Sequence, residues 1–329
     1  MRLRPRTLPA LLTQSAVLLL VTCIGCSRDL PVSPGAAADP FGFADALAAS
    51  SSPSGAFFPL TVGNRWHATA ESHVAVLPAG GGSPFEEFSY YSDISRELTG
   101  TETLNGRTYT ILRETLIQTG PFDDEPDTYT SRTLYRQDQS GLYEGDQPPL
   151  VQQPAPASLS GEAKEIRADA SRWPLPSQLR ARLPLEQVPA YERAWNELQD
   201  RKALVRGMLT GHWSAVRSTG PLVDEITRLD YPMRSGAEWT IRCSPYFASA
   251  VEGVEHLHLP AGYFPAYRIR IDSEFFNEND SVHIWFGRSG QLQFLYHLTG
   301  IATDENGDEV GRLEFDYREA VDEVALVKP

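Results

Sequence analysis

The chain contains 329 residues, and its 43 acidic side chains outnumber its 29 basic ones to give a formal net charge of −14. Such an acidic balance disfavours nucleic acid and anionic lipid surfaces as partners. Two of the 3 cysteines lie within the first 26 residues, so we expect Cys243 to have no internal disulfide partner and the body to depend on its apolar core.

The first residues predict a signal peptide over residues 1–25. Arg2, Arg4 and Arg6 form a basic start, and an apolar stretch follows that is densest from Ala16 to Ile24. A helix needs about 20 apolar residues to span a membrane, and this stretch is too short. A short apolar segment behind a basic start is typical of a signal sequence.

The four residues Cys23-Ile24-Gly25-Cys26 resemble the lipobox of bacterial lipoproteins. The resemblance implies cleavage before Cys26, a thioether-linked diacylglycerol on its sulfur and usually a third acyl chain on its amine. Each buried CH₂ contributes about 0.8 kcal/mol, so several acyl chains hold a protein at a membrane where one would not. Ser27 at the next position implies the outer membrane of the cell envelope. The alternative is an ordinary secretory signal, because the motif usually has leucine where this chain has Cys23.

Residues 26–56 are rich in proline, alanine, serine and glycine. A segment of this composition buries too little apolar surface to order itself. The sequence therefore predicts a flexible tether between the lipid and the folded body.

The body contains an internal repeat. The segment Phe58–Trp66 matches the segment Tyr231–Trp239 in the pattern aromatic-Pro-(Leu/Met)-x-x-Gly-x-x-Trp. We expect each glycine at a turn that needs a positive φ, and each tryptophan at the start of a strand, where it fills the core. The shared positions are Pro59, Gly63, Trp66, Pro232, Gly236 and Trp239.

Further matches follow each copy of this motif in the same order. Gly100–Glu102 parallels Gly253–Glu255, and a turn with an aromatic strand comes after each. Ordered matches of this kind indicate a duplication. The sequence predicts one β repeat over residues 57–146 and a second over residues 213–329.

The insert between the repeats, residues 147–212, has two parts. Its start is rich in proline and is expected to be irregular. Its second part predicts an amphipathic helix that packs on the sheet of its own chain in preference to a partner, with Glu197 and Arg201 as a supporting ion pair. The apolar positions at helical spacing are Val188, Tyr191, Trp195, Leu198 and Val205.

The second repeat shows the alternation of half-buried strands. Tyr267, Ile269 and Ile271 alternate with Arg268 and Arg270, and comparable strands follow. Short turns between them favour antiparallel hairpins. The expected fold is mainly β, with duplicated antiparallel β-meanders that form a curved sheet, half-barrel or barrel-like body, and a helical insert between the repeats. The expected turns are Asn277–Asp280, Arg288–Gly290 and Asn306–Gly307.

The repeat resembles a family of bacterial lipoproteins with internally repeated β-domains. The pieces that carry the resemblance are Pro59–Trp66, Pro260–Ile269 and Ile284–Gly287. No activity comes with this resemblance. A looser architectural analogy is the curved half-barrel sheet of envelope lipid carriers.

Motifs for catalysis or cofactors are absent from the sequence: it contains no Gly-x-Ser-x-Gly elbow, Walker loop, dinucleotide fingerprint or His-Glu-x-x-His. The best metal candidates are His256 and His258, which point from one face of a predicted strand with Cα atoms about 6.6 Å apart. A zinc site needs a third ligand, for which only His283 or a neighbour of Glu255 can be nominated. A solvated strand face is the favoured reading, so neither a metal nor a cofactor is expected.

Three other groups invite functional readings. His67, Glu71 and His73 share a strand face, but about 20 Å separates the two histidines. Cys243 is expected to be a buried structural thiol. The segment Asp304–Asp308 starts like a calcium loop and then departs from the pattern, which favours a hairpin turn.

The function expected from the sequence is that of a lipid-anchored envelope protein that binds an apolar ligand or a protein partner without catalysis. The alternatives are a structural or interaction scaffold of the envelope and, less favoured, a metal-dependent hydrolase that uses His256 and His258. No nucleic acid partner is expected.

Overall fold

The computed structural model describes residues 58–120, 126–145, 175–210, 225–243 and 246–327. The predicted signal peptide, the lipidation site Cys26, the tether and the proline-rich part of the insert lie outside the described residues. The side chain of Cys243 also lies outside them. Among the helices within these ranges, none has the length and apolar character to cross a membrane.

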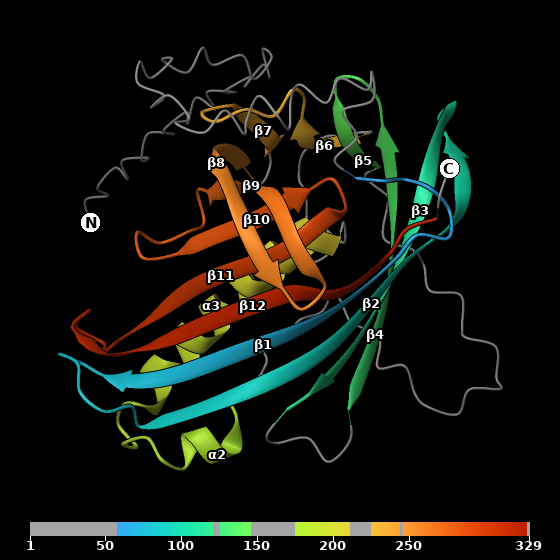
Figure 1. The fold of residues 1–329 in the computed structure, drawn as a ribbon. Helices are drawn as coiled ribbons and strands as arrows, with labels where there is room; N and C mark the ends of the chain where they lie inside the picture. The colour runs from blue at the N-terminus through green and yellow to red at the C-terminus, as the bar shows by residue number, and fades with distance from the viewer. Residues whose placement is uncertain (1–57, 121–125, 146–174, 211–224, 244–245, 328–329) are drawn as a thin grey trace, which may run out of the picture. The chain divides into compact units, whose positions relative to one another are not determined.

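The described body is built on one antiparallel sheet with 12 strands in the order β6-β5-β4-β3-β2-β1-β12-β11-β10-β9-β8-β7 (Figure 1). This confirms the predicted mainly β, barrel-like class. The strands are β1 Arg65–Pro78, β2 Glu86–Leu104, β3 Arg107–Thr119, β4 Asp127–Gln137, β5 Gly141–Gly145, β6 Glu225–Asp230, β7 Glu238–Cys243, β8 Tyr246–Leu259, β9 Gly262–Ser273, β10 Ser281–Gly287, β11 Gly290–Thr303 and β12 Glu309–Ala325.

The sheet curves into a nearly closed barrel whose two free edges are β6 and β7. These strands follow one another in the chain, with only residues 231–237 between them. They are the two ends of the strand order, so no hydrogen-bonded ladder joins them. We call the line between these two edges the seam.

The strands form where apolar and polar residues alternate. Along β1 the side chains of Trp66, Ala68, Ala70 and Val74 are buried on the inner face of the sheet, whereas Glu71 faces outward. This is the pattern of an antiparallel sheet with one face against the core and the other in solvent. The hairpin between β2 and β3 turns at Asn105 and Gly106, which both have positive φ, 50° and 77°, as a type I′ turn requires.

The two copies of the Gly-x-x-Trp motif have the same local geometry. Gly63 and Gly236 have φ of 96° and 80°. The Gly63 N–H donates to the Leu98 carbonyl at 2.7 Å, and the Gly236 N–H donates to the Val251 carbonyl at 2.8 Å. Each acceptor lies on the strand after the motif, directly before a β-bulge. The duplication itself stays a prediction.

β6 lies within residues 213–329, the range predicted for the second repeat, yet it is hydrogen-bonded to β5. Each copy of the motif is therefore followed by six strands, β1 to β6 and β7 to β12. The β1–β12 pair joins these two halves of the sheet.

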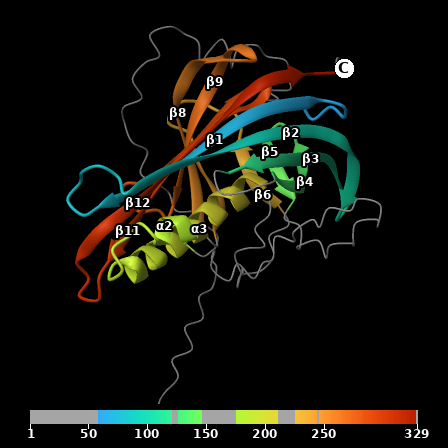
Figure 2. The ribbon, with the colours of Figure 1, turned by 90° about the horizontal axis from the view of Figure 1, so that it is seen from below.

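Helix α3, Val188–Thr210, packs on the inner face of β11 and β12, and the short helix α2, Ser177–Arg180, precedes it (Figure 2). All five apolar positions predicted for this helix are buried. The Tyr191 hydroxyl donates to the Leu77 carbonyl at 2.7 Å. Gly300 and Gly311 allow this close contact, since a Cβ at Gly300 would lie 2.8 Å from the Ala194 carbonyl oxygen.

The prediction that Glu197 and Arg201 form an ion pair is wrong. Arg201 points into the body, where its Nη1 lies 2.8 Å from Asp280 Oδ2 and its Nη2 donates to the Thr299 carbonyl at 2.5 Å. Arg201 is 7% exposed whereas Glu197 is exposed, so the arginine finds its partners in the interior and not along the helix surface.

The contact between α3 and the sheet predicts a large effect of a methyl group at Gly311. A Cβ there would overlap the Tyr191 hydroxyl and lie 2.5 Å from the Leu77 carbonyl oxygen. We expect Gly311→Ala to lower the free energy of unfolding by about 2–3 kcal/mol, as for other overpacked sites. Urea unfolding measures this. Gly253→Ala is the control, because a Cβ there meets nothing within 4 Å; equal losses for the two variants would contradict the packing of α3.

Candidate functional site

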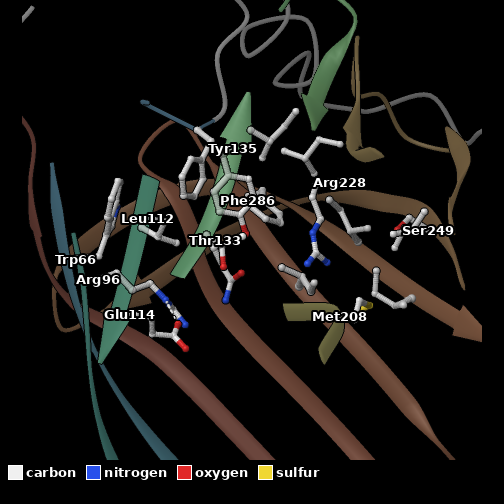
Figure 3. Close-up of a pocket in the computed structure, with 18 of the residues that line it drawn as sticks. Trp66, Arg96, Leu112, Glu114, Thr133, Tyr135, Met208, Arg228, Ser249 and Phe286 are labelled. Atoms are coloured by element: carbon white, nitrogen blue, oxygen red, sulfur yellow. Dashed lines mark hydrogen bonds and ion pairs between the residues drawn. The ribbon is translucent and has the colours of Figure 1, made fainter. Parts of the chain in front are cut away.

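A cavity of about 50 Å³ lies inside the barrel near the seam (Figure 3). Its walls come from both halves of the sheet and from α3, which contributes Met208. At 10–15 Å³ for each water, it has room for roughly four water molecules. Most of its wall is apolar, including Trp66, Leu229, Ile241, Ile284 and Phe286.

Both edge strands of the seam carry a β-bulge beside this cavity. On β6, the pairing with β5 jumps from Thr227 to Leu229, so Arg228 is the extra residue. On β7, the pairing with β8 jumps from Thr240 to Arg242, so Ile241 is the extra residue. A bulge bends its strand and re-aims a side chain. Here both extra residues line the cavity.

Arg228 forms a buried ion pair with Glu144 on β5. Arg228 Nε donates to Glu144 Oε2 at 2.5 Å, and the two side chains are only 9% and 0% exposed. Burial alone would lower the pKa of Arg228, but the charge of Glu144 raises it above its ordinary value. The guanidinium therefore stays charged, and Glu144 neutralises it.

Two donors at the cavity have no partner among the described residues. They are Nη2 of Arg228 and the hydroxyl Oγ of Ser249, a residue on β8 that is 2% exposed. Figure 3 shows both side chains at the cavity. A buried donor without an acceptor costs about 1–3 kcal/mol, so these two atoms mark a place for an acceptor.

A second buried charge network lies on the far wall of the cavity. Arg96 Nε donates to Glu114 Oε2 and its Nη1 donates to Glu319 Oε1, both at 2.6 Å. Gln291 Nε2 and the Tyr317 hydroxyl also donate to the Glu319 carboxylate. Burial would lower the pKa of Arg96, but the two carboxylates hold it well above its ordinary value. This network links β2, β3, β11 and β12 across the middle of the sheet.

Lys202 on α3 is a further basic side chain that packs against the interior. Its Nζ lies 4.4 Å from the ring centre of Phe315 and 6.0 Å from that of Tyr90. Burial, followed by the charge of Arg206, lowers the pKa of Lys202 to about 7. The amine therefore changes charge near neutral pH inside the body.

The structure gives the two motif tryptophans different surroundings. Trp66 is 4% exposed and lines the cavity, and its Nε1 donates to the Ser289 carbonyl at 2.6 Å. Trp239 is half-buried on β7 and packs against the main core without lining the cavity. The motif prolines precede the two turns, where the Pro59 carbonyl accepts from Asn64 and the Tyr231–Pro232 bond is cis.

The predicted metal candidates lie far along the same sheet from this cavity. His256 and His258 flank Tyr263, with ring centres 5.2 Å and 4.7 Å from that ring. His283, nominated as a third ligand, instead lies 3.3 Å from Glu252. Within the described ranges, no group of three or more His, Cys, Asp or Glu residues is arranged to hold a metal ion.

The remaining candidates lie on the outer face. His67 joins Asp322 and Asp93 across three strands, at 2.5 Å and 3.0 Å, and the two aspartates raise its pKa. Glu71 and His73 instead border an outer hollow of about 340 Å³ over β1, β10, β11 and β12.

The segment Asp304–Asp308 is the turn between β11 and β12. The Asp304 carboxylate accepts from the N–H groups of Asn306 and Asp308 at 2.8 Å and 2.9 Å. Its oxygens therefore stabilise the turn.

Sequence reasoning missed the polar groups at the cavity, above all Arg228 with its partner Glu144, and Ser249. The available signal was a charged residue, Glu144 or Arg228, within each of the short segments that form β5 and β6. With 5 and 6 residues, β5 and β6 are too short for their alternation to be read alone.

No protein-family model and no curated protein matches this chain. A Bacteroides fragilis protein described as exported, with a YmcC-like fold, is 8% identical over 82% of this chain and 99% of its own, with a TM-score of 0.33. A protein from Parabacteroides distasonis described as a lipoprotein is 12% identical over 82% and 98%, with a TM-score of 0.30. Lipovitellin is 9% identical, with 26% of its chain covered and a TM-score of 0.26. Structural similarity at this level supports no conclusion about the family or the function of this chain.

The low pKa of Lys202 predicts a pH-dependent gain from Lys202→Met. Below pH 7 the amine is charged in the folded and unfolded states, so its full burial cost is present; the cost falls as the pH rises from about 7 towards the unfolded value of about 10.4. We expect Lys202→Met to raise the free energy of unfolding by at least about 1.4 kcal/mol at pH 6.5, and the gain to vanish near pH 10. Urea unfolding across this range measures it, with Arg234→Met at an exposed site as the control. A gain that does not change with pH would contradict the interior placement of the amine.

Proposed function

We propose that this chain is a lipid-anchored cell-envelope protein whose barrel-like body binds an apolar ligand at the seam cavity without catalysis. The proposed location depends on the resemblance of Cys23-Ile24-Gly25-Cys26 to a lipobox. On this proposal Cys26 is acylated and its lipid anchors the chain in the outer membrane. The proposed activity depends on the cavity. The chain belongs, on this proposal, with bacterial lipoproteins that have internally repeated β-domains.

The observation that carries the proposed binding role is the convergence of both bulged edges on one cavity. Ligand sites are mostly apolar hollows with a few placed polar groups, and this cavity has apolar walls with Arg228 and Ser249 facing it. The seam lacks a hydrogen-bonded ladder, so a ligand can enter there without breaking strand pairs. With about 50 Å³ available, one end of the ligand occupies the cavity and the rest lies along the seam.

The chemistry of the polar groups supports binding without catalysis. Two guanidinium groups line the cavity, Arg96 and Arg228, and both are ion-paired. A guanidinium stays protonated near neutral pH, so neither group can act as an acid or a base. Glu114 and Glu144 are the partners in these pairs, so neither carboxylate is placed to act as a base.

A structural or interaction scaffold is the second candidate. The observation that favours it is the small size of the cavity beside a core that side chains and α3 otherwise fill. A scaffold needs no ligand, so the two candidates differ in whether the purified body carries a bound molecule.

The anchor prediction is tested by Cys26→Ser in a bacterial host. Because the thioether forms on the cysteine sulfur, we expect the variant to lose all palmitate incorporation and to appear in the soluble fraction. Radiolabelled palmitate and membrane fractionation measure this, with Cys23→Ser as the control that keeps the label. Undiminished labelling of Cys26→Ser would contradict the assignment.

The binding role is tested by narrowing the cavity. Native mass spectrometry of Cys26→Ser protein, purified from the soluble fraction in which we expect it, should show a species heavier than the bare chain by a ligand mass. Ile241→Phe fills part of the cavity, so we expect it to reduce that species at least fivefold. Ile94→Phe makes the same change at a buried site away from the cavity and should keep it. A bare chain in every sample would contradict ligand binding and favour the scaffold.

A further inference from the structure

We infer that the seam cavity recognises an uncharged oxygen acceptor, such as a ketone, ester or amide carbonyl, at the end of an apolar molecule. This inference rests on the proposed function, because it names the chemistry of the ligand that binds at that cavity. It is argued from the donors at the cavity, from the charges around it and from its size.

The donors define what the ligand must supply. Arg228 Nη2 and Ser249 Oγ face the cavity, and neither has a partner among the described residues. Arg228 is on the edge strand β6, and its side chain is 9% exposed. Ser249 is on β8, which is the neighbour of the other edge strand, β7. An oxygen acceptor between them would therefore bridge the two sides of the seam. Hydrogen bonds from a charged donor are stronger than those from a neutral one.

The charges around the cavity favour an uncharged acceptor over an anion. Glu144 already neutralises Arg228, and Arg96 is shared by two carboxylates, Glu114 and Glu319. These buried groups thus contain more negative than positive charge. A carboxylate ligand would be buried without a counter-charge of its own, which is strongly unfavourable.

The size and walls of the cavity define the rest of the ligand. A volume of about 50 Å³ holds only a few non-hydrogen atoms. Ile241, Ile284 and Phe286 surround them with apolar surface. The acceptor must therefore lie near one end of the molecule, and the atoms that follow it must be hydrocarbon.

Methionine methyl groups provide a local reporter of binding. Beyond Met1, the chain has only Met208, which lines the cavity, and Met233, which is 2% exposed and does not line it. The full chain with Cys26→Ser and ¹³C-methyl methionine is titrated with 2-pentanone, n-pentane and pentanoate. We expect the Met208 signal to move with 2-pentanone at about tenfold lower concentration than with the other two probes, because only the ketone is both uncharged and an acceptor. The Met233 signal should not move.

Matched variants assign the preference to the two donors. Ser249→Ala should weaken the binding of 2-pentanone about fivefold and leave the binding of n-pentane unchanged. Ser92→Ala is the control, because this serine is buried on the inner face away from the cavity, and it should change the binding of neither probe. Arg228→Leu alone would remove the positive charge that neutralises the buried Glu144 carboxylate and would strongly destabilise the body. The double variant with Glu144→Leu avoids this and should abolish the preference for the ketone.

The outcomes separate this inference from the proposed function. If 2-pentanone and n-pentane move Met208 equally and Ser249→Ala is silent, the cavity binds apolar molecules but the acceptor chemistry is overturned. If pentanoate binds best, the site is an anion site and the inference is overturned in favour of a charged ligand. If no probe moves Met208, the proposed binding role fails together with the inference.

Discussion

The antiparallel pairing of β1 with β12 is the interaction on which the rest of the body depends. It runs from Arg65 opposite Ala325 to Pro78 opposite Gly311 and joins two sets of six strands, each a simple succession of neighbours. Because the first and last strands meet in the middle, the two free edges must be consecutive strands of the chain. The seam is thus a direct consequence of this one pairing, and so is the place of the cavity beside it.

Free strand edges tend to pair with other chains, and native proteins protect them with bulges, charges or short strands. β6 and β7 have 6 residues each and each contains a bulge. The bulges that protect the edges also turn Arg228 and Ile241 inward. The backbone irregularity that protects the edges is therefore also the one that places side chains at the proposed ligand site. The buried pair of Arg228 and Glu144 is a weak source of stability, because desolvation offsets much of its attraction.

Much of the fold could be predicted from the sequence because it follows from short-range patterns. Alternation placed the strands of the second repeat, and the turn at Asn306–Gly307 lies between β11 and β12 as expected. The helical spacing from Val188 to Val205 gave α3 and its buried side. The anchor at Cys26 stays a prediction, since it lies outside the described residues.

The cavity could not be predicted, for physical reasons. Regular alternation predicts that Arg228 and Leu229, which are consecutive, point to opposite faces of the sheet. Because a bulge interrupts the two-residue period there, both side chains line the cavity. The partners of the buried charges are also far apart in the sequence: Arg96 pairs with Glu319, and Arg201 pairs with Asp280 instead of the expected Glu197. Such partners come together only when the sheet curves, and a local sequence pattern does not reveal which distant residues then meet.

The start and the end of the described body also meet. The Val327 N–H donates to Asn64 Oδ1 at 2.7 Å, where β1 begins and β12 has just ended. A peptide bridge between these ends, with the backbone opened between β6 and β7, would give a circularly permuted chain. Its strands would run from β7 through β12 and β1 to β6 in the order of the sheet, with the helical insert still between β5 and β6. The native order of the chain thus keeps a covalent link across the seam, and the permuted order would remove it.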